Sequence, residues 1–245
     1  MLDVASGAQP GDAVTLTGTE AHHAAVVRRV RVGEAVTVGD GAGAWLSGQC
    51  ESVAPREVVI RVAERVDVAR PTPRLVLVQA LAKGDRDELA VQAATELGAD
   101  EIVPWQASRS VSRWEAKAEK GRARWAAIVR EAAKQAHRAW VPDVAALTST
   151  TQLVARVQRD RVLVLEPSAT TRLSSLALGV SGNDGARDTR DIVLVVGPEG
   201  GVSAEELEAL TAAGATAVRL GESVLRTSTA GPAALSVASH LLGRW

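Results

Sequence analysis

Three short apolar runs after residue 70 constrain the fold of this chain more than any other feature. They read LVLVQAL at 75–81, RVLVL at 161–165 and IVLVV at 192–196. Runs of this kind, without alternating polar residues, are typical of strands that are buried on both faces of a parallel sheet. Segments with helical periodicity lie between them, which predicts an α/β fold with helices on both faces. Ligands of such sheets bind beyond the carboxyl ends of the strands.

The same part of the chain contains further predicted helices and strands. One helix is expected at 87–97, with Leu89, Ala93 and Leu97 on its apolar face. The last helix is expected at 232–242, because Pro232 suits a first helical turn. The other helices are expected at 115–138 and 204–213, and shorter strands at 101–105 and 217–220.

Residues 1–70 have a different pattern. Short β-type segments at 13–17, 35–38, 44–46 and 58–62 are separated by glycine-rich turns, with one predicted helix at 20–31. This predicts a small β-barrel or sandwich. The segment ARPTP at 69–73 has two prolines around a threonine and marks a linker. We therefore expect one domain over 1–70 and a second over 71–245.

Composition bears on several classes of protein. The formal net charge is −1, but nine Lys and Arg stand against three Glu over 109–138. That excess fits either a solvated helix face or a phosphate-binding face. The single cysteine, Cys50, allows neither a disulfide framework nor a Cys/His zinc site, and it favours a cytoplasmic location. We expect no secretory leader, no membrane span and no metal.

The segment VVGPEGGVSAEELEAL at 195–210 is a candidate ligand loop. Ser203 and Glu206 have the spacing of a capping box, so a helix is expected to begin just after Ser203. The glycines allow close backbone approach, although a tight turn without a ligand is the alternative. Glu199 would repel a phosphate, and no P-loop lysine is present. The loop therefore favours a ligand that offers hydrogen-bond donors or positive charge.

A second candidate loop, LGESVLRTSTA at 220–230, also follows a predicted strand and precedes a helix. Its Leu225 offers an apolar surface for a flat ring, and its Arg226 offers a partner for an anion. A purely structural helix entry is the alternative for this loop taken alone. Two such loops after neighbouring strands of one sheet strengthen each other. The stretch SGNDGARDTR at 181–190 is polar and without periodicity, and we expect a mobile loop there.

Two other patterns are weaker. The residues at 39–44, GDGAGA, match a dinucleotide fingerprint, but no helical pattern follows, so a hairpin turn is expected. The adjacent His22 and His23 would point to different faces of a helix, which argues against a metal pair. Together with the arginines at 28, 29 and 31 they fit either an exposed cap or an RNA-contacting cluster.

Taken together, these segments resemble the bacterial family of small-subunit ribosomal RNA uridine-N3 methyltransferases (RsmE-like) within the SPOUT superfamily. The resemblance covers nearly the whole chain. The matching motifs are His22-His23 with VRRVR at 27–31, QALAKGDR at 79–86, QAATELG at 92–98, IVP at 102–104 with RSV at 109–111, Trp125 with EAAKQ at 131–135 and Arg138, GPEGG at 197–201, and Leu220-Gly221 with VLRT at 224–227. One departure stands at Ser228, where many relatives carry a glutamate.

The resemblance implies an N-terminal PUA-like β-barrel that binds RNA and a C-terminal SPOUT methyltransferase domain whose chain forms a trefoil knot. It also implies a homodimer that acts on 16S ribosomal RNA within an assembled small-subunit particle, with S-adenosylmethionine as cofactor. The implied cofactor-binding residues are Leu165, Glu166, Gly197, Pro198, Gly200, Gly201, Leu220, Gly221, Ser223, Val224, Leu225 and Thr227.

Catalytic and RNA-binding roles follow from the same resemblance. Arg226 would stabilise charge on the uracil oxygens, and Glu199 would orient the base or take its N3 proton. The expected RNA-binding residues are His22, Arg28, Arg29, Arg31, Lys83, Arg86, Arg109, Arg113 and Arg138. Three alternatives stay open: a related enzyme acting on another RNA or a ribose 2′-hydroxyl, a non-catalytic ribosome-assembly factor, and a nucleotide-dependent oxidoreductase.

Overall fold

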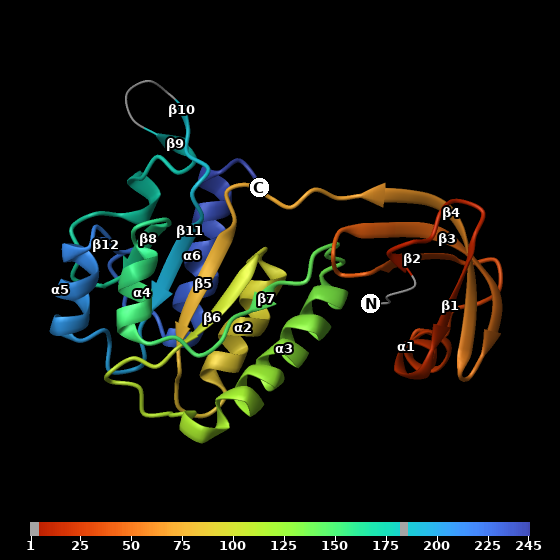
Figure 1. Ribbon diagram of the computed structural model, residues 1–245, viewed down its shortest axis with the longest axis horizontal. Helices are drawn as coiled ribbons and strands as arrows, with labels where there is room; N and C mark the ends of the chain where they lie inside the picture. Colours follow the sequence, from red (N-terminus) through yellow and green to blue (C-terminus); the bar gives the residue numbers. More distant parts are fainter. Residues whose placement is uncertain (1–4, 182–185) are drawn as a thin grey trace. The chain divides into compact units, whose positions relative to one another are not determined.

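The computed structural model describes residues 5–181 and 186–245, so residues 182–185 of the polar loop predicted to be mobile lie outside the described residues. The chain forms two compact units (Figure 1). The first comprises residues up to Arg70 together with His137–Val141, and the second comprises Pro71–Ala136 and Pro142–Trp245.

The first unit is built on an antiparallel sheet with the strand order β1-β4-β3-β2. The strands are β1 Ala13–Thr17, β2 Ala35–Gly39, β3 Ala44–Ala54 and β4 Glu57–Asp67. All four strands were predicted, but β3 and β4 are longer than expected, at 11 residues each. The predicted hairpin at 39–44 is confirmed, because β2 and β3 pair directly across it.

The single helix predicted at 20–31 is wrong. The chain forms a short α1, Gly18–His22, and then a π-helical turn, His23–Val27. Arg29 has a positive φ of 55°, which is incompatible with a continuing right-handed helix. The arginines at 28, 29 and 31 therefore lie in an exposed turn rather than along a helix face.

The second unit contains the predicted parallel sheet, in the order β12-β8-β11-β5-β6-β7 (Figure 1). The strands are β5 Leu75–Ala80, β6 Glu101–Trp105, β7 Asp143–Val144, β8 Arg161–Leu165, β11 Ile192–Val196 and β12 Thr216–Val218, and β9 Val180–Ser181 pairs separately with β10 Ala186–Arg187. The side chains of β5 and β11 are buried throughout, as expected for central strands.

Helices cover both faces of this sheet. The helices are α2 Arg86–Glu96, α3 Ala118–Gln135, α4 Thr150–Arg156, α5 Ala204–Ala212 and α6 Thr227–Leu241, with 3-10 turns at Glu115–Lys117 and Leu173–Ser175. Leu153 of α4 and Leu210 of α5 pack with Val76 and Val193 in one core layer. Helices α2 and α6 pack against each other, and α6 also contacts β5 and β11.

Three helix predictions need correction. The buried face of α2 is formed by Ala90, Val91 and Ala94, whereas Leu89 is 51% exposed. Small side chains allow this face to approach its neighbours closely, and the spacing of the leucines alone did not reveal that. Helix α3 is shorter than the predicted span, ending at Gln135 before a positive φ at His137.

The last helix begins five residues before the predicted start. Thr227 is its first residue, so Pro232 lies inside the helix rather than in its first turn. The first turn is held from outside the helix, because the Thr227 hydroxyl donates to the Gly197 carbonyl at 2.8 Å. A tertiary contact therefore sets this boundary, and no local propensity indicates it.

Candidate functional site

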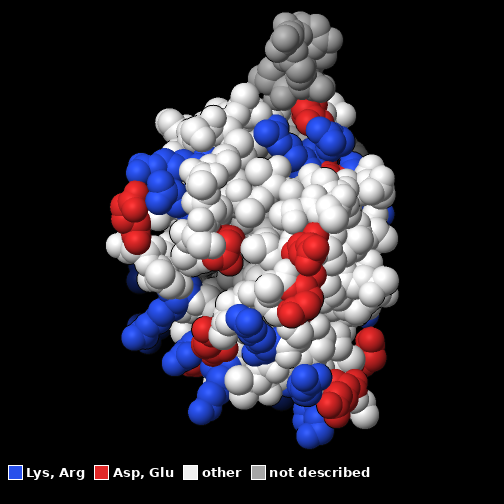
Figure 2. All heavy atoms as spheres, turned by 90° about the vertical axis from the view of Figure 1, so that its left-hand side faces the viewer, with Lys and Arg blue, Asp and Glu red and all other residues white. Residues whose placement is uncertain are grey.

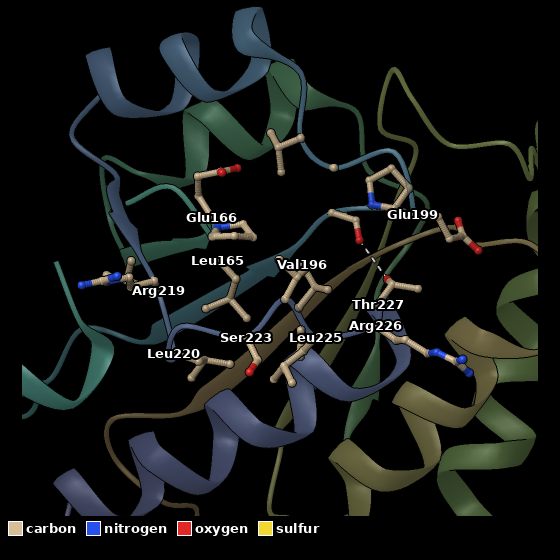
Figure 3. A pocket seen from close by; sticks show the side chains of 18 of the residues that line it. Leu165, Glu166, Val196, Glu199, Arg219, Leu220, Ser223, Leu225, Arg226 and Thr227 are labelled. Carbon is tan, nitrogen blue, oxygen red and sulfur yellow. Dashed lines mark hydrogen bonds between the residues drawn. The ribbon is translucent and has the colours of Figure 1, made fainter. Parts of the chain in front are cut away.

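A pocket of about 310 Å³ lies where β8, β11 and β12 end (Figure 3). Both candidate loops line it. Its lining includes every predicted cofactor-binding residue except Gly200, together with Glu199 and Arg226. The lining residues that the sequence did not suggest for the cofactor are Arg86, Pro167, Val196, Val202, Val218, Arg219 and Ala230. Pro167, Val196, Val218 and Arg219 lie at or near the ends of strands, and that position is the signal that points to them.

The first loop folds back sharply after β11. A Cβ at Gly197 would lie 2.9 Å from Val202 Cγ2 and 3.0 Å from the Val202 nitrogen, so no side chain fits there. Gly201 has a φ of 72°, a conformation that favours glycine. The predicted capping box is confirmed: the Glu206 amide donates to Ser203 Oγ at 3.2 Å, and the Ser203 amide donates to Glu206 Oε2 at 3.3 Å.

Glu199 binds groups of its own chain. Its Oε1 accepts hydrogen bonds from the Lys83 amide and from Nη1 of Arg86, both at 3.0 Å. Partial burial alone would raise the pKa of this carboxyl, but hydrogen bonds from the Glu199 and Lys83 amides and from Arg86 lower the pKa below its ordinary value. A carboxylate with a lowered pKa is a weaker proton acceptor. The geometry favours a positioning role for Glu199.

The outer side of the first loop is held by Arg109. Its Nη1 donates to the Gly200 carbonyl at 3.0 Å. A Cβ at Gly200 would lie 3.4 Å from Cβ of Arg109, so the two backbones approach closely. Gly200 therefore packs against the segment after β6, whereas its neighbours Glu199 and Gly201 line the pocket.

The second loop contributes an exposed apolar surface. Val224 is 77% exposed and Leu225 is 37% exposed, and both line the pocket. Exposed apolar side chains at the edge of a pocket are typical of ligand-binding surfaces. Arg226 precedes the first turn of α6, and within the described ranges no hydrogen bond or ion pair engages its guanidinium. That group is available to an anion.

Charged residues surround the edge of the pocket next to β12. The Glu222 carboxylate accepts hydrogen bonds from Nη2 of Arg172 at 2.7 Å and from Nη1 of Arg219 at 3.2 Å. Nε of Arg219 is buried without a hydrogen-bond partner in the described part of the chain. Glu166, at the end of β8, accepts from the amide and the hydroxyl of Ser168. The pocket thus combines apolar walls with carboxylates and arginines, and no lysine is found among its described lining residues.

The predicted RNA-binding residues are distributed over both units. In the first unit His22, Arg28, Arg29 and Arg31 are exposed, and Arg138 is half-buried. In the second unit Lys83, Arg86, Arg109 and Arg113 are exposed. Three of these four contact the first pocket loop, as described above for Glu199 and Gly200.

Over residues 5–181 and 186–245, no cluster of three or more His, Cys, Asp or Glu side chains suited to a metal ion occurs. No helix in those ranges combines the length and the apolarity that crossing a membrane requires.

Comparisons with known proteins agree with this architecture. Residues 70–239 match the model of an RNA methyltransferase domain, and residues 16–62 match that of an RNA methyltransferase PUA domain. The ribosomal RNA small subunit methyltransferase E of Mycobacterium bovis is 44% identical over 96% of this chain and 89% of its own length. The protein of the same name from Bacillus subtilis is 35% identical over 92% of this chain and 89% of its own length.

Two solved structures are similar throughout. A ribosomal RNA small subunit methyltransferase E from Neisseria gonorrhoeae, bound to S-adenosyl methionine, has a TM-score of 0.82 and 26% identity over 96% of this chain and 94% of that one. A methyltransferase from Legionella pneumophila, in complex with SAM, has a TM-score of 0.80 and 30% identity over 95% and 93% of the two chains.

The fold and the matched models define the class: this is an RNA methyltransferase with an N-terminal PUA domain. The identity to the curated relatives extends over nearly the whole chain. The chain therefore belongs to the family of ribosomal RNA small subunit methyltransferases E, which confirms the resemblance that its motifs indicate.

Proposed function

We propose that this protein methylates N3 of a uridine in 16S ribosomal RNA and takes the methyl group from S-adenosylmethionine. The observation that carries the proposal is the meeting of two glycine-bearing loops in one pocket at the carboxyl ends of the parallel strands (Figure 3). Support also comes from the two similar methyltransferase structures that contain this cofactor.

The side chains that line the pocket fit that cofactor. Leu165, Val196 and Leu225 provide apolar walls for an adenine ring. Glu166 and Glu199 provide carboxylates, which suit a ligand with a sulfonium and an ammonium group and would repel a polyphosphate. The remaining predicted contacts are backbone groups of the two loops. When bound, S-adenosylmethionine supplies an electrophilic methyl group.

Two side chains are assigned to the substrate. Uracil N3 carries a proton at neutral pH and becomes nucleophilic when that proton leaves, so negative charge develops on the uracil oxygens. Arg226, whose guanidinium has no partner among the described residues, would stabilise that charge. Glu199 would hold the first loop and orient the base, because its carboxylate is engaged by Lys83 and Arg86.

The RNA path is assigned to the exposed basic residues of each unit. In the second unit Lys83, Arg86 and Arg109 contact the first pocket loop, and Arg113 follows Arg109 closely in the chain. Lysine and arginine side chains, with some carboxylates among them, project from the lower edge of the face in Figure 2. This is the end toward which β5 and β11 run in Figure 1. In the first unit the assigned residues are His22, Arg28, Arg29, Arg31 and Arg138.

Further parts of the proposal concern organisation. We propose a PUA-like RNA-binding domain over 1–70 and a knotted methyltransferase domain over 71–245. The knot is supported by the path of the chain, which returns from edge strand β12 to a helix packed on β11 and β5. A homodimer, a cytoplasmic location and a substrate inside an assembled small-subunit particle also belong to the proposal. Light scattering in solution tests the dimer.

Calorimetry with S-adenosylmethionine, NAD and ATP tests the cofactor assignment. We expect binding of S-adenosylmethionine alone, and preferential binding of ATP or NAD would contradict the proposal. Mass spectrometry of digested ribosomal RNA from cells with and without the protein tests the target. The expected result is loss of one N3-methyluridine from 16S RNA. Loss of a 2′-O-methyl group, or of a mark on transfer RNA, would assign a different substrate.

A further inference from the structure

Gln79 is a buried polar residue that contacts the pocket-lining Thr227. It lies in β5, one residue before the strand ends, and has no solvent exposure. Its Nε2 donates to Thr227 Oγ1 at 2.9 Å and to the Ala80 carbonyl at 3.1 Å. Both hydrogens of the amide are thereby used.

Thr227 passes this interaction on to the first pocket loop. Its hydroxyl donates to the Gly197 carbonyl at 2.8 Å (Figure 3). A hydroxyl has one proton, so the proton given to Gly197 fixes the other interaction: Oγ1 must accept from Gln79. The hydrogen bonds therefore run in one direction, from Gln79 through Thr227 to Gly197, and we call this chain of two hydrogen bonds the relay. It joins the ends of β5 and β11 to the start of α6.

The peptide unit at the end of the relay, between Gly197 and Pro198, has a single hydrogen-bonding group. The residue after Gly197 is Pro198, which has no N–H. The Gly197 carbonyl is therefore the only hydrogen-bonding group of that peptide unit. Its orientation sets the direction in which Pro198 and Glu199 leave β11, and both residues line the pocket.

The helix end of the relay is held rigidly. One turn after Thr227, a Cβ at Gly231 would lie 2.8 Å from Cδ1 of Leu77 and 3.4 Å from Cγ2 of Val196. The backbone of α6 therefore packs directly on the side chains of β5 and β11. A shift of Thr227 relative to Gln79 would require this close packing to change.

The amide of Gln79 has an energetic cost that an apolar side chain at the same position would avoid. Oε1 of Gln79 is buried without a hydrogen-bond partner among the described residues. An unpaired buried acceptor is unfavourable, and an apolar side chain would remove the penalty. The amide is nevertheless present, in a strand whose other residues are all apolar.

We infer that Gln79 is a positioning residue for the cofactor pocket: through Thr227 it fixes the Gly197 peptide and so couples the two pocket loops. The inference rests on the proposed function, because the ligand of the pocket is taken to be S-adenosylmethionine. Gln79 is not one of the pocket-lining residues and acts through Thr227 and Gly197.

The experiment compares Thr227→Val, Thr227→Ser, Gln79→Leu and the double variant Gln79→Leu/Thr227→Val in the full chain. Affinity for S-adenosylmethionine is measured by calorimetry, and ligand-free stability by thermal unfolding. Thr95→Val is the control, because it removes another buried threonine hydroxyl, from α2, where Oγ1 donates to the Val91 carbonyl.

We expect Thr227→Val and Gln79→Leu each to weaken binding about tenfold, with the control within about twofold of the unaltered protein. Thr227→Ser keeps the hydroxyl and is expected to lose less affinity than Thr227→Val. The double variant is expected to bind about as weakly as either single variant, because both remove the same relay. Additive losses, or an equal loss in Thr95→Val, would overturn the inference.

A ligand-free measurement separates this inference from the proposed function. The Gly201 amide donates to the Pro198 carbonyl at 2.9 Å, so its hydrogen exchange reports on the first loop. Faster exchange in Thr227→Val and Gln79→Leu, but not in Thr95→Val, supports the relay even if S-adenosylmethionine does not bind. Unchanged exchange in both relay variants would refute it.

Discussion

Nη1 of Arg86 lies 3.0 Å from Oε1 of Glu199, although 113 positions separate the two residues in the sequence. The ion pair joins the first residue of α2 to the glycine loop that lines the pocket. The same carboxylate oxygen accepts the Lys83 amide. The Glu199 side chain thus joins the segment at 83–86 to the glycine loop, and this arrangement favours a positioning role over proton transfer.

Glu199→Gln tests this positioning role. We expect affinity for S-adenosylmethionine to fall about threefold to tenfold, because the ion pair is partly exposed and contributes modestly. Turnover at saturating cofactor should stay within about tenfold, because proton transfer by a general base is worth about 10²–10⁴. A larger loss of turnover at unchanged affinity would identify Glu199 as the base. Turnover is measured with saturating cofactor, and affinity is measured separately by calorimetry. The losses of affinity in Arg86→Gln and Glu199→Gln should not add in the double variant, because both remove the same ion pair.

Arg226→Ala tests charge stabilisation. Arg226 lines the pocket and its guanidinium engages no partner among the described residues, so we expect turnover to fall about 10²–10³-fold while affinity for the cofactor changes little. Arg226→Lys keeps the charge and loses the planar fork, so partial activity is expected. Single-turnover kinetics with a ribosomal RNA substrate gives the rate. If the single variants Arg226→Ala and Glu199→Gln were both fully active, the roles assigned to Arg226 and Glu199 would be wrong.

Salt dependence tests the RNA-binding face. Phosphate contacts release counterions, so affinity for a 16S RNA fragment should fall steeply as salt rises. Arg113→Ala removes one exposed cation and should reduce the slope of log affinity against log salt by about one. Arg159→Ala is the control, since this exposed arginine pairs with Asp160 and is not among the assigned residues. A flat salt profile in the unaltered protein would contradict the assignment.

Glu206 supports the first loop from within the fold and gives a prediction for stability. It is 6% exposed and accepts the Ser108 amide at 2.8 Å, the Ser108 hydroxyl at 2.9 Å and the Thr150 hydroxyl at 2.8 Å. Glu206→Gln replaces one accepting oxygen by a donor and should lower the free energy of unfolding at pH 7 by about 2 kcal/mol. Glu208→Gln, on the exposed side of the same helix, should change it by less than about 0.5 kcal/mol. Urea unfolding measures both.

The difference in the free energy of unfolding between the unaltered protein and Glu206→Gln should depend on pH in a defined direction. Burial alone would raise the pKa of Glu206, but the Ser108 amide, the Thr150 and Ser108 hydroxyls and the Ser203 amide outweigh burial and lower the pKa. A lowered carboxyl pKa stabilises the fold above the pKa of the unfolded chain, about 4.3, and the stabilisation is lost as pH falls through the folded value. The gap between the unaltered protein and Glu206→Gln should therefore narrow below about pH 4. A gap that widens there would contradict the assignment.

Local sequence determined much of the architecture. The apolar runs of β5, β8 and β11 predicted strands buried on both faces, because an unbroken run leaves no side for water. The capping box at Ser203 and Glu206 predicted where α5 begins, since both bonds form within four residues. The family motifs carried the rest of the functional prediction, including the two loops of the pocket.

Only the tertiary structure decided the contacts between distant segments. Strand order placed β8 and β5 on either side of β11, and that order brought the loops after β8, β11 and β12 together. The start of α6 at Thr227 and the role of Gln79 depend on hydrogen bonds that span 30 and 148 positions. Hydrophobic periodicity reports which face of an element is buried, but not which partner buries it. Partner choice depends on packing and on hydrogen bonds between groups far apart in the chain, which exist only once the sheet has formed.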